Sequence, residues 1–258
     1  MKNLTILAYH RVFPEHRGEL AVTPQQFKDQ LSFFIKRKYS FKTLKEVYEL
    51  YLQNDKAIPQ KTIVITFDDG YRDNYEYAYP ILKELNLPAT IFLVANYIDQ
   101  NKHFPWDKED PALKNIILSE KDYPLTWQQV KEMQTTGIEF GSHTLEHHKL
   151  THIPIQDAWQ EIYQSKQLLE ERLQAKIYSF CAPHGYVNSA LTKLSEKSGY
   201  TLGVLNPPGI RGQDAGLPET NHSLRRIGVY QKDTPFKLLL KESALFNLYR
   251  KIRSVFKR

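Results

Sequence analysis

Two adjacent carboxylates, Asp68 and Asp69, directly follow an apolar run in the string Thr-Phe-Asp-Asp-Gly that ends at Gly70. Like charges placed side by side raise each other's pKa, so this pair is costly unless something stabilises it. An ordinary Asp-Gly turn with solvated side chains would explain the pattern. The chemical interpretation is that one carboxylate binds a cation while the other stays free as a base.

A group of histidines in the string Ser-His-Thr-Leu-Glu-His-His, residues 142–148, follows another apolar run. His143 and His147 are four positions apart, so on a helical turn both side chains would point the same way. Two imidazoles and one carboxylate leave open coordination positions on a catalytic metal. Surface or core histidines without a metal are the alternative. If both apolar runs are strands of one sheet, the two motifs meet at one rim.

A third motif, Phe-Cys-Ala-Pro-His-Gly-Tyr at residues 180–186, also follows an apolar run. Pro183 and Gly185 indicate an unusual loop path. One interpretation is a turn that leads into a helix capped by Asn188. The other is a loop that aims a backbone N–H into an active site, where it would stabilise an oxyanion.

The elements that must position these motifs alternate along the chain. Short apolar runs rich in β-branched and aromatic residues predict buried parallel strands, and helical patterns lie between them. This alternation predicts a distorted, seven-stranded (β/α) barrel, with an open doubly wound sheet as the alternative. The predicted strands are residues 4–9, 62–67, 89–94, 138–141, 177–181, 200–205 and 226–229, and the predicted helices start at Thr23, Thr43, Asn74, Thr126, Gln156 and Asn188. Two long loops, 98–123 and 206–224, are expected to be functional.

The composition is that of a globular protein. The chain has 258 residues, of which 41% are hydrophobic and 25% charged. Such a chain has enough apolar surface to bury a core, so intrinsic disorder is excluded. One cysteine, Cys181, excludes an intramolecular disulfide and a cysteine-based zinc module. The net charge of +6 is small and no recognised module is present, so we expect no nucleic-acid partner. No signal peptide or spanning segment is visible, which predicts a cytoplasmic protein.

We expect residues 1–232 to form the catalytic domain and residues 233–258 to form a basic amphipathic helix, part of that domain or appended to it. Five basic residues crowd the last nine positions of the chain. The helix either packs on the barrel or makes a peripheral contact with anionic lipid at the inner face of a membrane.

The three motifs together resemble those of the polysaccharide deacetylase family, which is carbohydrate esterase family 4, with the nodulation-type chitooligosaccharide deacetylase domain. The Thr-Phe-Asp-Asp-Gly string matches the first family motif residue for residue, and Ser-His-Thr-x-x-His matches the second. Tyr9-His10, Thr126-Trp127 and the Leu-Arg-Arg-Ile segment at 224–227 resemble the poly-N-acetylglucosamine deacetylase branch. The resemblance spans roughly residues 4–230.

By this resemblance, Asp69, His143 and His147 are metal ligands and Asp68 is the general base. The metal would be zinc, with cobalt, nickel or iron as alternatives, because such a ligand set accepts each of them. Asp68 would take a proton from a metal-bound water as it attacks the acetamide carbonyl. The resemblance places the oxyanion-stabilising backbone N–H at His184.

The chain departs from the family pattern in the third motif. Cys181 stands where the family often has an arginine that orients the base, and His184 stands where it has a tyrosine. The late aspartate and the Leu-x-His general acid of the family are not recognisable. His10, His184 and His222 are therefore the candidate proton donors, and His10, Pro183 and His184 are expected to line the substrate site.

The expected function is a metal-dependent hydrolase that removes N-acetyl groups from an amino sugar of a polysaccharide or glycoconjugate. One alternative is a deacylase or deformylase of a lipid-linked amino sugar. Another is a catalytically silent glycan-binding homologue. The sequence leaves the sugar, its linkage, its carrier and the oligomeric state open.

Overall fold

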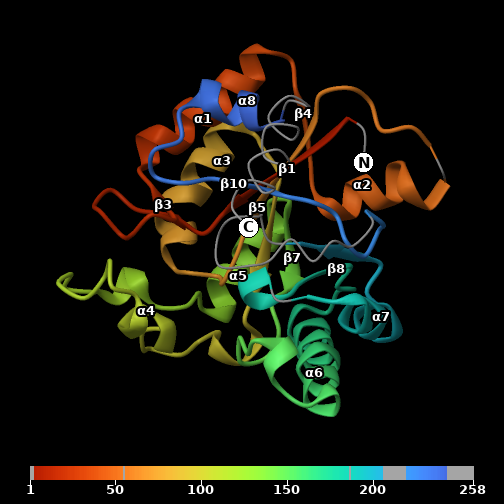
Figure 1. The fold of residues 1–258 in the computed structure, drawn as a ribbon. Coiled ribbons are helices and arrows are strands. Elements are labelled where there is room, and N and C mark those ends of the chain that lie inside the picture. Colours follow the sequence, from red (N-terminus) through yellow and green to blue (C-terminus); the bar gives the residue numbers. More distant parts are fainter. Residues whose placement is uncertain (1–2, 55, 186, 206–218, 243–258) are drawn as a thin grey trace, which may run out of the picture.

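A parallel β-sheet curled into a half-barrel forms the centre of the computed structural model, which describes residues 3–54, 56–185, 187–205 and 219–242 (Figure 1). The strand order along the sheet is β10-β1-β5-β6-β7-β8-β9, and every pairing is parallel. The seven predicted strands are therefore confirmed. Their bounds are β1 Leu4–Tyr9, β5 Thr62–Phe67, β6 Ala89–Leu93, β7 Ile138–Ser142, β8 Ser179–Cys181, β9 Leu202–Val204 and β10 Ile227–Gly228.

The segment that leads into β10 links the two edges of this sheet. Leu224 pairs with Val204 of β9, and Ile227, three residues later, pairs with Leu7 of β1. One short stretch of chain therefore pairs with β9 at one edge of the sheet and continues as β10 at the other. This arrangement favours the barrel prediction over the open doubly wound sheet.

Three short strands were not predicted. β4 (Ser40–Lys42) pairs with the first half of β5, and β2 (Arg11–Val12) pairs with β3 (Ala21–Val22) in a separate ribbon. Each has only two or three residues, and β4 begins and ends with polar residues. They therefore lack the apolar run that identifies the longer strands.

The helices begin where capping residues predict. Thr23, Thr43 and Thr126 each accept a hydrogen bond from the backbone N–H three positions later in a capping box. The helices are α1 Pro24–Lys36, α2 Leu44–Leu50, α3 Tyr79–Leu85 after a π-turn at Asn74–Ala78, α4 Pro105–Glu109, α5 Trp127–Thr135, α6 Ile155–Leu173, α7 Ser189–Lys197 and α8 Pro235–Glu242. Short 3₁₀ turns occur at Leu52–Asn54, Ala95–Tyr97, Glu120–Asp122, Leu150–His152 and Pro183–Gly185.

The helices surround the sheet in groups. In Figure 1, α1, α3 and α8 gather at the upper left, α2 lies on the opposite side, and α6 and α7 lie together at the lower right. The predicted loop 98–123 contains α4, which lies apart from the α1, α3 and α8 group. Most of the second predicted loop, residues 206–218, falls outside the described residues.

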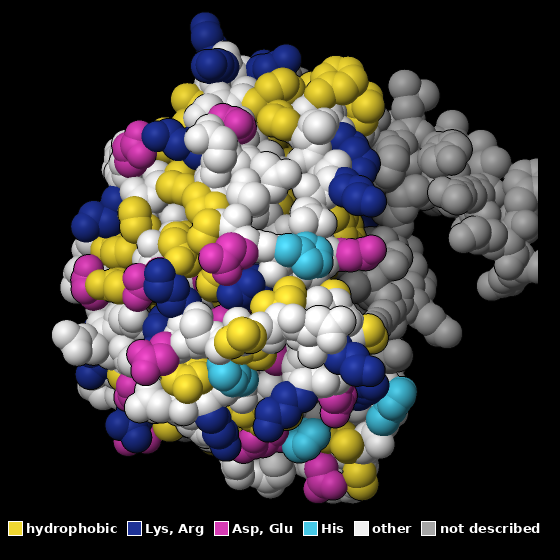
Figure 2. Space-filling view, turned by 90° about the vertical axis from the view of Figure 1, so that its left-hand side faces the viewer, with side chains coloured by type: hydrophobic (Ala, Val, Ile, Leu, Met, Phe, Trp, Pro, Cys, Tyr) yellow, Lys and Arg dark blue, Asp and Glu magenta, His cyan; other side chains and the backbone are white. Residues whose placement is uncertain are grey.

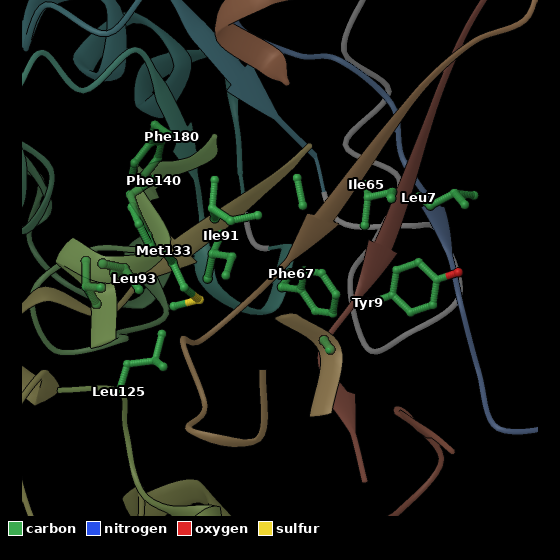
Figure 3. Packing of buried hydrophobic residues seen from close by; sticks show 14 of the residues in the cluster. Leu7, Tyr9, Ile65, Phe67, Ile91, Leu93, Leu125, Met133, Phe140 and Phe180 are labelled. Carbon is green, nitrogen blue, oxygen red and sulfur yellow. The ribbon is translucent and has the colours of Figure 1, made fainter. Parts of the chain in front are cut away.

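Alternate residues of each strand pack on opposite faces of the sheet. On one face, Tyr9 and Phe67 are fully buried with ring centroids 5.5 Å apart, and they join the large core shown in Figure 3. On the inner face, Phe92 belongs to a smaller core that also contains Cys181. A side chain at Gly141 would clash there, because its Cβ would lie 2.6 Å from the Phe92 ring. The period-two alternation thus determines which side chains point into the barrel.

The first turns of the predicted C-terminal helix pack on the domain. Leu238 of α8 is fully buried, and Glu242 accepts hydrogen bonds from Thr5 Oγ1 at 2.8 Å and Tyr39 Oη at 2.7 Å. Residues 243–258, which include the basic cluster, lie outside the described residues. The membrane contact therefore stays a prediction.

Two surface properties bear on possible partners. Within the described residues, no helix combines the length and apolar character needed to cross a bilayer. On the face shown in Figure 2, Lys and Arg side chains are interspersed with Asp and Glu, so that face presents charges of both signs side by side.

Candidate metal centre and catalytic carboxylate

Four side chains at or just beyond the carboxyl ends of their strands point into the barrel, because they follow the same two-residue alternation as the inward-facing strand residues. They are His10 after β1, Asp68 after β5, His143 after β7 and Cys181 at the end of β8. Because parallel strands end at the same rim, these side chains meet there. The two motifs that the sequence predicted to converge are therefore brought together by the barrel.

Asp68 is held by Arg226, which comes from the segment just before β10. In a bidentate pair, Arg226 Nη1 lies 2.7 Å from Asp68 Oδ1 and Nη2 lies 2.8 Å from Oδ2. Such a fork of two parallel hydrogen bonds adds geometric specificity to the charge attraction. Nη1 also donates to Thr66 Oγ1 at 3.1 Å, and Nε donates to the Leu205 carbonyl at 3.0 Å. Both partners of the ion pair are buried, so the geometry fixes the carboxylate plane of Asp68.

The pKa of Asp68 follows from this pairing. Burial by itself would raise the pKa of the carboxyl, but the Arg226 guanidinium lowers it below its ordinary value, and His10 contributes in the same direction. The His10 Nε2 atom lies 3.6 Å from Asp68 Oδ2. Asp68 is therefore ionised at neutral pH, as a general base must be.

Arg226 supplies the guanidinium that the third motif lacks. Cys181 was predicted to be a departure because an arginine is often found there, and no role was predicted for Arg226. In the structure, Arg226 Nη2 lies 3.0 Å from Cys181 Sγ. The signal in the sequence was the alternation itself, since Arg226 lies two residues after Leu224, which belongs to the inner core.

Asp69 lies between the two predicted histidine ligands. Its Oδ1 atom is 3.5 Å from His143 Nε2 and 3.2 Å from His147 Nε2. Asp69 has a positive φ of 72°, and Gly70 has one of 79°. This left-handed turn leaves the Asp69 carboxylate beside both histidines. The predicted triad is therefore assembled.

The geometry of this triad suits one metal ion. Oδ1 of Asp69 is buried and has no hydrogen-bond partner among the described residues, although two imidazole nitrogens lie close to it. Ligands that stand about 2.0–2.1 Å from one tetrahedral ion are roughly 3.3 Å apart, which is close to the observed spacings. The three ligand atoms lie within 4.8 Å of one another. The carboxylate and the two imidazoles therefore fit a divalent metal.

The tautomer of His143 also suits a ligand. Its Nδ1 atom lies 2.7 Å from the Cys181 carbonyl oxygen. Since a carbonyl oxygen can only accept a hydrogen bond, Nδ1 carries the proton. Nε2 then presents its lone pair toward Asp69, as a metal ligand must. Burial lowers the pKa of His143 to about 4, so the imidazole is neutral at ordinary pH.

His147 does not lie on a helical turn, so that part of the prediction is wrong. Residues 143–149 form an irregular loop in which Thr144 and His147 have positive φ angles of 71° and 64°. Glu161 of α6 holds this loop by accepting hydrogen bonds from the backbone N–H groups of Leu145 at 3.1 Å and Glu146 at 3.0 Å. The two histidines converge because the loop folds back, not because of helical periodicity.

A second group of possible ligands, Asp68, His143 and Cys181, lies beside the first. It fits a metal less well, because both Asp68 oxygens already accept hydrogen bonds from Arg226. Burial raises the pKa of the Cys181 thiol well above its ordinary value, so the thiol stays protonated. A cation there would also lie next to the guanidinium. Cys181 is therefore a buried neutral residue, as predicted.

The remaining predicted residues divide between the rim and the edge of the sheet. His184 lies at the rim, with its ring centroid 4.6 Å from that of His147, and its φ of 58° confirms the unusual loop path beside buried Pro183. Burial lowers the pKa of His184 to about 4. His222 lies elsewhere, with its backbone against Gly203 of β9, and the charged group that acts on it is Glu196 of α7. The role of His222 as a proton donor stays a prediction.

Comparisons with known proteins show similarity to one family over most of the chain. Residues 55–203 match the polysaccharide deacetylase family. The Bacillus subtilis protein YxkH, assigned by name to the polysaccharide deacetylases, is 32% identical over 226 residues, which cover 88% of this chain and 71% of the relative. The poly-beta-1,6-N-acetyl-D-glucosamine N-deacetylase of Staphylococcus epidermidis is 28% identical over 231 residues, which cover 86% of this chain and 72% of the relative.

A solved structure has the same fold over nearly the whole chain. The Streptococcus pyogenes deacetylase PplD, in complex with acetate, superposes with a TM-score of 0.74 and 27% identity, covering 93% of this chain and 98% of that one. The family match contains both aspartates and both histidines of the triad region, whereas His10 and Arg226 lie outside it. The resemblance seen in the motifs is thereby confirmed, and the chain belongs to the polysaccharide deacetylase family.

Proposed function

We propose that this chain is a metal-dependent hydrolase that removes N-acetyl groups from an amino sugar of a polysaccharide or glycoconjugate. One observation carries the proposal. A buried carboxylate kept ionised by a bidentate guanidinium stands next to an Asp-His-His group that could hold a metal ion. Zinc is the metal we propose, with cobalt, nickel or iron as alternatives.

The chemistry divides between the two adjacent aspartates. A divalent ion held by Asp69, His143 and His147 would activate water and polarise the amide carbonyl. Asp68 accepts the proton of the attacking water, because Arg226 keeps it ionised and fixes its orientation. We assign the oxyanion-stabilising backbone N–H to the loop at Pro183–Gly185, because the ring of His184 in this loop lies 4.6 Å from that of His147.

The proton donor to the leaving amine is assigned by position. His10 is the imidazole beside the base, with Nε2 3.6 Å from Asp68 Oδ2, and it is partly exposed at the rim. His184 instead packs its ring near His147. We therefore assign the donor role to His10, which can take up the proton that Asp68 has accepted. His10→Gln should lower turnover more than His184→Gln does.

The proposal is tested by metal removal together with a substrate panel. Chelation should abolish acetate release, and zinc should restore it in proportion to metal bound at one ion per chain. The panel comprises N-acetylated oligosaccharides, lipid-linked N-acetylated sugars and their N-formyl analogues, so that the carrier and the acyl group are varied separately. Full activity after complete metal removal, or sugar binding with no release of acetate or formate from any member, would overturn the proposal.

A further inference from the structure

The two histidines of the triad are oriented in different ways. The ring of His143 is held by a hydrogen bond from Nδ1 to the Cys181 carbonyl. The ring nitrogen Nδ1 of His147 makes no such bond to another described residue. Rotation about the χ2 bond of an imidazole is broadly permitted, so a ligand histidine needs a partner that fixes its ring. Something other than a hydrogen bond must do this for His147.

Trp106 of α4 is the side chain placed to orient this ring. Its indole stacks on the imidazole of His147, with ring centroids 4.0 Å apart and an interplanar angle of 29°. Rotation of the imidazole would break this contact and would move Nε2 away from Asp69. We propose that Trp106 is a positioning residue for His147, an inference that rests on the proposed metal site.

The indole is itself held by a chain of hydrogen bonds. Trp106 Nε1 donates to Tyr71 Oη at 3.0 Å, and Tyr71 Oη donates to Asp107 Oδ1 at 2.6 Å. Tyr71 and Asp107 are both buried, which strengthens bonds of this kind and makes them costly to break. A hydroxyl that accepts one bond and donates another orients both neighbours. The Trp106 ring is therefore fixed in plane as well as in position.

The same chain joins two parts of the metal site. Tyr71 lies two residues after Asp69, in the turn that directs that carboxylate. The hydrogen bonds thus connect the turn that carries one ligand to the indole that covers another. Phe104 stacks on Trp106 with ring centroids 4.4 Å apart, and Tyr97 contacts it edge-on at 5.5 Å. This part of the predicted functional loop 98–123 therefore packs next to the proposed metal site and supports the Trp106 ring.

The test is the zinc affinity of metal-depleted protein, measured by titration against a chromophoric chelator of known affinity. Loss of a residue that orients a metal ligand typically weakens metal binding about 10–100-fold, and this is the loss expected for Trp106→Ala. Trp106→Phe keeps a stacking ring but loses the N–H, so its zinc affinity should fall less than that of Trp106→Ala. Tyr71→Phe removes the acceptor of the same hydrogen bond. The double variant Trp106→Phe/Tyr71→Phe should therefore bind zinc no less tightly than whichever of the two single variants has the lower zinc affinity.

The matched control is Trp159→Ala. Trp159 is a partly exposed tryptophan of α6 that stacks on Tyr163 at 5.1 Å, and its replacement should leave zinc affinity unchanged. Thermal unfolding of each metal-free variant checks that the protein is folded. If Trp106→Ala does not fold, Trp106→Phe and Tyr71→Phe carry the test.

The outcomes separate this inference from the function on which it rests. Wild-type protein that binds no divalent metal would remove the proposed metal site, and this inference with it. Wild-type protein that binds zinc, with folded variants of Trp106 and Tyr71 that bind it equally well, would overturn the positioning role alone. A loss of zinc affinity in these variants but not in Trp159→Ala supports the positioning role of Trp106.

Discussion

Two buried clusters of opposite charges lie in this molecule, and their charge balance differs. In one, Arg11 Nε pairs with Asp73 Oδ2 at 2.7 Å, while Asp122 Oδ1 accepts from Arg11 at 2.5 Å and from Arg17 at 2.9 Å. Asp73 and Asp122 each have a guanidinium partner there. In the other cluster, the guanidinium of Arg226 pairs with both oxygens of Asp68, and Asp69 has no Lys or Arg partner among the described residues.

This difference separates a structural cluster from a functional one. A buried charge without a partner is costly, so an unbalanced carboxylate indicates that something else balances it. Asp69 instead faces the Nε2 atoms of His143 and His147, and imidazole nitrogens are common ligands for a metal ion. We infer that the first cluster holds loops together and that the second holds a metal.

The largest expected effect comes from removing the base. Asp68→Asn should lower the kcat of acetate release by about 10²–10⁴-fold, the range for a general base, because the amide cannot accept the proton. Metal content should stay at the wild-type level, since Asp68 is not a ligand in the proposed site. Turnover within about tenfold of wild type would contradict the assignment of the base.

The first cluster should respond in the opposite way. Asp122→Asn removes the buried carboxylate that Arg11 and Arg17 share and should lower the free energy of unfolding by about 3–5 kcal/mol, as breaking a buried ion pair does. Zinc affinity of the folded protein should not change. Denaturant unfolding checks the loss of stability, and zinc titration on the same sample checks the zinc affinity. A loss of zinc affinity without a loss of stability would contradict a purely structural role for this cluster.

Replacing Arg226 should move the pH profile. The guanidinium lowers the pKa of Asp68. Arg226→Met should therefore raise that pKa. A base works only above its pKa, so the acid limb of kcat against pH should shift upward. Arg226→Lys keeps the charge but not the bidentate geometry and should shift it less. If the acid limb of the kcat profile lies at the same pH in both variants as in the wild type, a group other than Asp68 determines it.

The smallest expected effect concerns the loop that carries His147. Glu161 accepts two backbone hydrogen bonds from this loop. Glu161→Ala should therefore weaken zinc binding by roughly tenfold, the low end for a supporting residue. Glu170→Ala, on the same helix but paired with Lys166, is the control that should leave zinc affinity unchanged. Equal affinities in the two variants would show that the loop does not need this anchor.

Much of the fold follows from local chemistry. Threonine caps at 23, 43 and 126 start helices, and the apolar runs at Leu4–Tyr9 and Thr62–Phe67 are strands with the predicted bounds. These signals are local, because a cap or an apolar run acts on its own neighbours. The strand β4 was not predicted because it is stabilised by its pairing with β5, which a short polar segment does not reveal.

The sequence by itself predicted the ligand set, since the resemblance of its motifs to the family implied Asp69, His143 and His147 as metal ligands, and the structure brings these three side chains together. Helical spacing was the wrong local reason for the histidines, whose convergence depends on a folded loop and on Glu161. Only the tertiary structure decided how Asp68 is kept ionised. Arg226 is 158 residues away along the chain and reaches Asp68 because the segment before β10 lies across the barrel rim. A contact between such distant residues has no local signal, since it is produced by closure of the sheet.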